Sequence, residues 1–196
     1  MDIDDFIDPR YLVPLLVVLM VLGGIAFAVM RSIIGKKRLQ ATPAWARGAY
    51  SIWTGGEDSG TWDAQRAATS LQNWYGATNA QSFWNVVNEL RQGQSGNVAW
   101  DQVRALDLLR IAAAARWIDE EKCFVECGGI GRYLQGKFQS WEELAAAFEA
   151  GMKEWHRVRN VRDPQELNRV QRNLPTLRTQ IWPKVPFKMP LAAEED

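Results

Sequence analysis

The chain has 196 residues, and its 23 Lys and Arg side chains equal its 23 Asp and Glu side chains. This length suits one domain with a hydrophobic core. The zero net charge, which holds also for residues 39–196 with 18 basic and 19 acidic side chains, argues against a nucleic-acid partner, because such proteins carry a basic excess.

A long apolar run lies near the amino terminus. Residues 11–30 are twenty consecutive residues without a charge, and a helix of that length spans about 30 Å, the thickness of a bilayer core. A cleavable signal peptide has a basic start and a small-residue cleavage site. Here four aspartates precede the run, and "RSIIGKKR" follows it. We therefore expect a retained transmembrane helix over residues 11–34 and a lipid bilayer as a partner.

Charges beside this run predict its orientation, because the side richer in Lys and Arg stays in the cytoplasm. The basic residues cluster on the carboxyl side: Arg31, Lys36, Lys37 and Arg38. We expect residues 1–10 to be extracytoplasmic and the chain from about Arg31 onward to lie in the cytoplasm, at a bacterial inner membrane. This basic cluster could also attract anionic lipid headgroups. Gly24 and Ala28 form a small-residue pair that could support a homo-oligomer through the helix.

The remaining elements follow in chain order as an all-α pattern with no alternating strand signal. We expect a basic linker and short aromatic segment over 35–60, then a compact, Trp-rich helical domain over 61–174. Its helices are predicted over 61–75, 82–92, 100–116, from 119, over 140–155 and from 163, the last opened by Asp163 and Pro164. The glycine run "CGGIG" predicts either a helix break or a close helix crossing.

The segment 175–196 carries four of the eight prolines, which excludes a regular helix or a central strand. It is either an extended arm packed on the domain or a mobile tail that binds something. Trp182, Phe187 and Met189 favour packing on its own domain.

A hexapeptide occurs twice, as "WDAQRA" at residues 62–67 and "WDQVRA" at residues 100–105. On a helix, the Trp, Asp and Arg of each copy lie within about one turn. We favour a structural role: a carboxylate at the helix start, a local ion pair and an anchoring indole. The segment "SWEE" repeats the device with a capping box. The predicted helix-locking residues are Trp62, Asp63, Arg66, Trp100, Asp101, Arg104, Ser140, Trp141 and Glu143.

These motifs resemble the bacterial domain of unknown function 1266 family (YbeU/YbeR-like proteins) over residues 61–156, without the anchor or the Pro-rich tail. The family's Trp-Asp-x-x-Arg-Ala helix is matched by Trp100, Asp101, Arg104 and Ala105. Its later Ser-Trp-Glu-Glu helix is matched by Ser140, Trp141, Glu142, Glu143, Gly151 and Trp155. The "CGGIG" run departs from the continuous helix of that pattern. The resemblance implies a compact all-α domain and carries over no reaction or catalytic residue.

Enzyme motifs are scarce, and we expect no cofactor. The candidate catalytic groups are Asp63, Arg66, Asp101, Arg104 and His156, and they require one shared cleft. Cys123, Cys127 and His156 are weak metal candidates, because their spacing fits zinc sites poorly; in the cytoplasm the cysteines should be free thiols.

The segment after Trp155 is rich in Arg and could face the membrane or form a solvated helix face. We interpret the chain as a single-pass membrane protein whose cytoplasmic helical domain binds other protein subunits, as an accessory or scaffold. The alternative is an effector- or toxin-type enzyme, hydrolase-like, that uses Asp, Arg and His of the helical domain.

Overall fold

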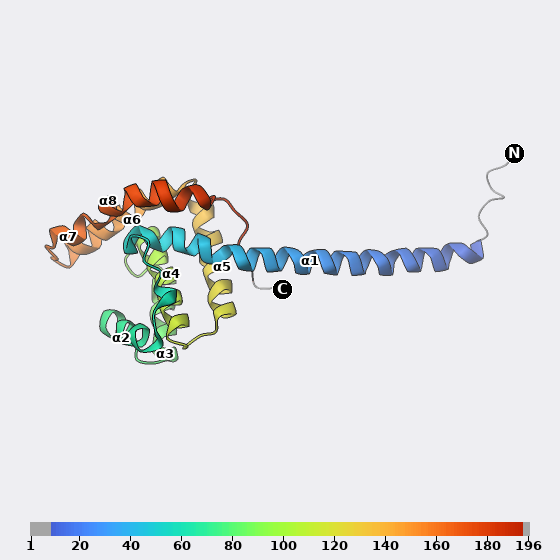
Figure 1. The fold of residues 1–196 in the computed structure, drawn as a ribbon, viewed down its shortest axis with the longest axis horizontal. Coiled ribbons are helices and arrows are strands. Elements are labelled where there is room, and N and C mark those ends of the chain that lie inside the picture. The colour runs from blue at the N-terminus through green and yellow to red at the C-terminus, as the bar shows by residue number, and fades with distance from the viewer. Residues whose placement is uncertain (1–8, 194–196) are drawn as a thin grey trace. The chain divides into compact units, whose positions relative to one another are not determined.

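A computed structural model describes the backbone of residues 9–193 and the side chains of residues 19–193. Within these residues the chain forms helices and turns and no β-strand, which confirms the predicted all-α class (Figure 1). The chain divides into two compact units, Met1–Lys37 and Arg38–Asp196, which are described separately below.

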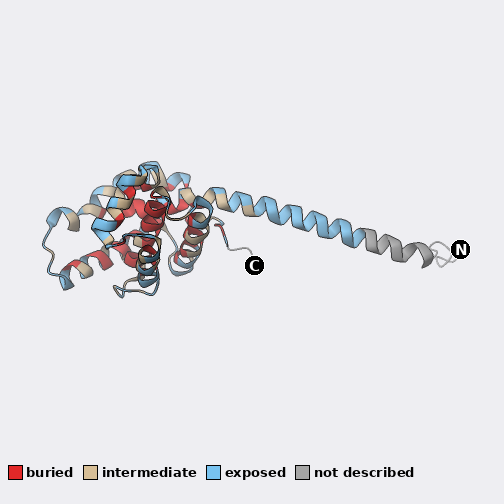
Figure 2. Cartoon of the chain, turned by 90° about the horizontal axis from the view of Figure 1, so that it is seen from below, coloured by how far each residue is buried: buried red, intermediate tan, exposed pale blue. Residues whose placement is uncertain are grey.

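The first unit consists of the amino-terminal part of helix α1, Pro9–Thr54. Its large apolar side chains between Leu19 and Ile34 are 42–69% exposed, and Figure 2 shows this stretch in the colour of exposed residues. It supplies the one helix, within the described part of the chain, that is long and apolar enough to cross a membrane. A Cβ added at Gly24 would contact nothing within 4 Å.

The second unit begins with the remainder of α1, where we expected a linker and a short aromatic segment over 35–60. The helix instead continues to Thr54, and its side chains enter the core: Trp45, Ala46, Ala49, Tyr50 and Ile52 are fully buried. These residues recur at intervals of three and four, the spacing that places side chains on one helical face. The domain therefore starts before residue 61.

One central helix, α4 (Val98–Ala114), organises this unit, because thirteen of its 17 residues are buried. Around it pack the 3₁₀ turn η2 (Ser59–Thr61) and helices α2 (Ala64–Tyr75), α3 (Ala80–Arg91), α5 (Glu120–Lys137) and α6 (Trp141–Val158) (Figure 1). The chain continues through α7 (Pro164–Leu167), α8 (Arg169–Thr176), the π-type turn η3 (Leu177–Ile181) and η4 (Trp182–Lys184). Each predicted helix of the domain is present.

Helix α5 is continuous through Gly128, Gly129 and Gly131, so the predicted break does not occur. The alternative, a close crossing, does. A Cβ at Gly128 would overlap the carbonyl oxygen of Ala192, and one at Gly131 would overlap Leu191. These glycines therefore admit a neighbouring segment to the helix surface.

That segment belongs to the C-terminal arm, of which residues 175–193 are described. The arm packs on its own domain, with Leu177, Trp182, Val185, Phe187 and Leu191 buried. Its carbonyl oxygens accept hydrogen bonds from the domain: Phe187 from Trp45 Nε1 (2.8 Å), Val185 from Trp141 Nε1 (2.8 Å) and Met189 from Gln135 Nε2 (2.9 Å). The prolines were expected to exclude a regular helix from this segment, but its first part is helical. Helix α8 includes Pro175, and the short turns η3 and η4 continue to Lys184. Unlike the predicted boundary at residue 174, the domain includes the arm.

Candidate functional site

The first hexapeptide copy behaves as a helix start. Asp63 is the N-cap of α2, and its carboxylate accepts a hydrogen bond from the Arg66 amide (2.8 Å). The Arg66 guanidinium stacks over the Trp62 ring, 4.2 Å from its centroid, and pairs with Glu57 (2.7 Å) instead of Asp63. Both partners of this ion pair are about half exposed, so it contributes a few tenths of a kcal/mol.

The second copy lies elsewhere on its helix, because Asn97 provides an earlier cap for α4 by accepting from the Trp100 amide (2.9 Å). Asp101 is therefore inside the helix and fully buried, and its Oδ2 accepts from the Ser95 amide (2.8 Å). Arg104 turns toward the Trp100 ring (5.0 Å). The predicted ion pair within the hexapeptide is thus absent from both copies among the described residues. The copies differ in role because Asp63 caps its helix whereas Asp101 is buried inside one.

The "SWEE" segment caps α6 as predicted. The Glu143 amide donates to Ser140 Oγ (3.1 Å), and the Glu143 carboxylate accepts from the Gln139 amide (2.7 Å), one residue before the expected partner. Trp141 is buried and stacks on Trp182, with ring centroids 5.9 Å apart. This motif therefore joins the start of α6 to the C-terminal arm.

The candidate catalytic residues do not form one constellation. Asp63 and Arg66 are exposed at the start of α2, whereas Asp101 is buried in α4. No hydrogen bond or ion pair between described side chains joins the two copies. His156 of α6 is buried, and its Nε2 lies 3.7 Å from a carboxylate oxygen of Glu166 on α7, while its Nδ1 has no hydrogen-bond partner among the described residues.

Cys123 and Cys127 are buried free thiols on α5. A hydrogen bond from Cys127, together with the nearby Arg110 guanidinium, lowers the pKa of Cys123. No group of three His, Cys, Asp or Glu side chains is placed for a metal ion within the part of the chain that the structure describes. His156 on α6 is thus not brought to the two cysteines.

A polar stripe on α4, not predicted from the sequence, is formed by Asp101, Gln102, Arg104, Asp107 and Arg110. Its side chains contact several of the segments that surround the helix. Gln102 donates to the carbonyl oxygen of Arg91 at the end of α3 (3.2 Å), and Asp107 accepts from the Ser59 hydroxyl of η2 (2.8 Å). The stripe therefore fixes the segments around the central helix.

Arg110 and Asp107 form the most densely connected part of this stripe. The Arg110 guanidinium lies 3.9 Å from Asp58 Oδ1 and against Gly60, where a Cβ would overlap it. Asp58 also accepts from the Tyr50 hydroxyl of α1 (2.7 Å). Burial raises the pKa of Asp107 to about 6, against the opposing effect of the Ser59 hydrogen bond. The sequence signal was a row of four charged residues at intervals of three, Asp101, Arg104, Asp107 and Arg110, within a helix rich in Leu and Ala.

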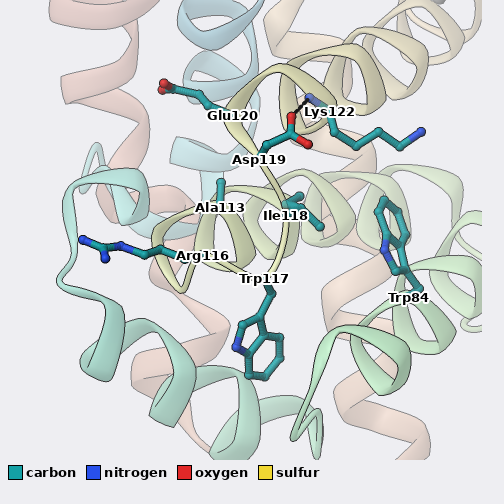
Figure 3. Close-up of a pocket in the computed structure, with 8 residues that line it drawn as sticks. All are labelled: Trp84, Ala113, Arg116, Trp117, Ile118, Asp119, Glu120 and Lys122. Carbon is teal, nitrogen blue, oxygen red and sulfur yellow. Dashed lines mark hydrogen bonds between the residues drawn. The ribbon is translucent and has the colours of Figure 1, made fainter.

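An open hollow of about 620 Å³ lies elsewhere, between α3 and the α4–α5 connection. Trp84, Trp117 and Ile118 supply its apolar surface. In Figure 3 the Arg116 and Glu120 side chains both extend toward the left of the view and Trp84 lies at the right, while Asp119 caps α5 through the Lys122 amide (2.7 Å). The hollow therefore lacks converging polar groups of the kind that orient a ligand.

Residues 59–187 match the family described as Protein of unknown function (DUF1266). The chain belongs to this family. Neither the curated proteins nor the solved structures gave a match.

The DUF1266 match is longer than the resemblance over residues 61–156, because it includes Ser59 and most of the C-terminal arm. This extent agrees with the packing, in which Val185 and Phe187 are buried core residues. It leaves out Trp45 and Tyr50, although both are fully buried in the same core. In this chain the end of α1 therefore completes the core beyond the matched DUF1266 region.

Proposed function

We propose that this DUF1266 protein is a single-pass, membrane-anchored helical interaction protein, an accessory subunit of a larger membrane-associated assembly. One observation carries the proposal. The large apolar side chains between Leu19 and Ile34 are 42–69% exposed, whereas most of those of the helical domain are buried in one core. Each Å² of apolar surface left in water costs about 25 cal/mol, so this stretch requires a lipid environment.

The flanking charges support a bacterial inner-membrane location with the domain in the cytoplasm. Arg31, Lys36, Lys37 and Arg38 follow the apolar stretch, and four aspartates precede it. Loops rich in Lys and Arg stay on the cytoplasmic side.

Two features support an interaction role over the alternative effector- or toxin-type enzyme. The charged groups of the α4 polar stripe contact neighbouring segments of the domain. The candidate catalytic residues Asp63 and Asp101 differ in burial and lie on separate helices. An enzyme of this kind would need them in one cleft.

Membrane extraction of the full-length protein tests the anchor. The wild type should stay in the membrane pellet after alkaline carbonate and dissolve in detergent. Leu22→Arg combined with Ile25→Arg should move it to the soluble fraction, because each Arg near the centre of a membrane helix costs about 2.5–3.5 kcal/mol. Val158→Arg is the matched control, since Val158 is a similarly exposed aliphatic residue of the domain, 69% exposed, and it should leave the protein in the pellet.

Release of the wild type by carbonate would contradict the anchor. The accessory role is tested separately by cross-linking in native membranes, followed by sizing of the purified protein. A protein that remains monomeric and cross-links to nothing in its own membranes would overturn that role.

A further inference from the structure

Three arginines stack on a row of adjacent indole rings from α1, α4 and α6, in which Trp53 and Trp155 are partly exposed and Trp100 between them is buried. The Arg169 guanidinium carbon lies 4.1 Å from the Trp53 ring centroid, that of Arg159 lies 5.1 Å from Trp155, and that of Arg104 lies 5.0 Å from Trp100. The rings themselves are adjacent, with centroids 5.7 Å apart for Trp53 and Trp100 and 5.9 Å for Trp100 and Trp155. We name these six residues the Arg–Trp face.

The positive charge of this face is not neutralised within the described part of the chain. No carboxylate there lies within 4 Å of the guanidinium groups of Arg104, Arg159 or Arg169. The nearby acids have other partners or roles: Glu149 pairs with Lys153, Glu154 with Arg157 and Glu166 with His156, while Asp163 caps α7. The three arginines therefore carry positive charges without a carboxylate partner among the described residues.

Stacking makes these arginines suitable for recognising carboxylates. A guanidinium on an indole ring keeps its N–H donors at the edge of the group, where a carboxylate can accept two of them. Contact with the ring also restricts the side chain before binding, which lowers the entropy that complex formation costs. Trp53, Trp155, Arg104 and Arg169 are each partly exposed, and Arg159 is exposed.

The partly exposed indole rings of the face favour a peptide over a lipid headgroup, because apolar side chains of a peptide can cover Trp53 and Trp155 while its carboxylates pair with the arginines. A nucleic acid fits less well, because residues 39–196 as a whole carry no basic excess.

We propose that the Arg–Trp face binds an acidic peptide segment of the protein partner. This inference rests on the proposed accessory function and names the chemistry of its partner. Carboxylates of the segment pair with Arg104, Arg159 and Arg169, and its apolar side chains contact the partly exposed rings of Trp53 and Trp155.

The test uses the full-length protein in phosphatidylcholine nanodiscs and a fluorescein-labelled hexaglutamate peptide, with binding followed by fluorescence anisotropy. Neutralising Arg104, Arg159 and Arg169 together to Gln should weaken binding about thirtyfold, at about threefold for each half-exposed ion pair. The matched control replaces Arg66, Arg91 and Arg157 with Gln. It removes the same charge, but these arginines already pair with Glu57, Glu126 and Glu154, so binding should change less than twofold.

Arg104 is partly buried, so the double variant Arg159→Gln with Arg169→Gln provides a second test, with an expected loss of about tenfold. Tryptophan fluorescence and thermal unfolding check that each variant is folded. Equal losses in the triple variant and its control would overturn the proposal, as would a wild type that does not bind hexaglutamate.

Two further probes distinguish the other anionic partners. Tighter binding of an oligothymidylate of equal charge through the same arginines would replace the peptide with a nucleic acid. Arginine-dependent binding to phosphatidylglycerol vesicles in preference to the peptide would replace it with a lipid. Either result overturns the acidic-peptide assignment. Carbonate resistance of the membrane-bound protein is measured independently, so failure here leaves the anchor intact.

Discussion

Asp107 carries the clearest consequence at the scale of single residues. Its carboxylate is buried beneath η2 and accepts one hydrogen bond from Ser59, while Glu57 and Asp58 add negative charge nearby. Burial, the largest cause, raises its pKa from 3.8 to about 6. The folded protein therefore binds this proton more tightly than the unfolded chain does.

We predict that stability falls as pH rises from about 4 to about 6, because the folded state binds more protons than the unfolded state in that window. This group should contribute a loss of about 3 kcal/mol, which is complete above about pH 6. Asp107→Asn should remove that part of the slope. Thermal unfolding of the full-length protein in detergent, measured across pH 4–7, provides the check.

Ser59→Ala is the informative companion variant, since the Ser59 hydroxyl lowers the pKa of Asp107. Its loss should extend the decline in stability to higher pH. Superimposable pH profiles for the wild type and Asp107→Asn would contradict the assignment.

The two hexapeptide copies show how context changes one pattern. Asp63 is exposed and caps α2, whereas Asp101 is buried and holds the loop before α4 through Ser95. A helix start depends on which upstream side chain can accept from the first amides. Asn97 takes that position in α4, so the identical residue pattern shifts into the helix interior.

At the scale of elements, the close contact between α5 and the C-terminal arm is the feature most open to test. Gly128 of α5 lies against the backbone of Ala192, and Gly131 lies against Leu191 and Trp45. A backbone neighbour cannot rotate away as a side chain can, so an added methyl group must displace the arm.

Gly128→Ala should therefore lower the free energy of unfolding by about 1–3 kcal/mol, as overpacking does. It should also expose the arm to trypsin at Lys184 and Lys188. Gly136→Ala is the control on the same helix, because a Cβ there meets nothing within 4 Å; it should stabilise by about 0.5–1 kcal/mol through helix propensity. Differential scanning calorimetry and limited proteolysis measure the two effects. Equal stability and equal cleavage of both variants would refute the tight crossing.

At the scale of the whole molecule, the proposed anchor predicts an orientation. The basic cluster after the apolar stretch should hold the domain in the cytoplasm. Two variants with one added cysteine each, Asp4→Cys and Arg178→Cys, report the two sides of the membrane. The natural Cys123 and Cys127 are buried, whereas Arg178 is exposed.

A membrane-impermeant maleimide should label Asp4→Cys in spheroplasts and label Arg178→Cys only after lysis. The wild type, which retains its two natural cysteines, controls for background. Labelling of Arg178→Cys in intact spheroplasts would place the domain outside and contradict the orientation.

Local chemistry determined much of this protein from sequence alone. The apolar run, the helix caps Asp63, Asp119, Ser140 and Asp163, and the apolar periodicity act over a few residues. They predicted the all-α class, the helices of the domain and the apolar helix without reference to any distant contact. The family match agrees with the resemblance carried by the two Trp-containing helices.

Tertiary structure alone decided the remainder, because burial and pairing depend on segments far apart in the chain. Only the fold shows that Trp45 belongs to the core, that Gly128 admits the arm, and that Asp107 is buried beneath Ser59. The same holds for Arg104, Arg159 and Arg169, which lie 10–65 residues apart and stack on adjacent indole rings. Local patterns specify helices, and only the packing of those helices determines which charges remain without a partner.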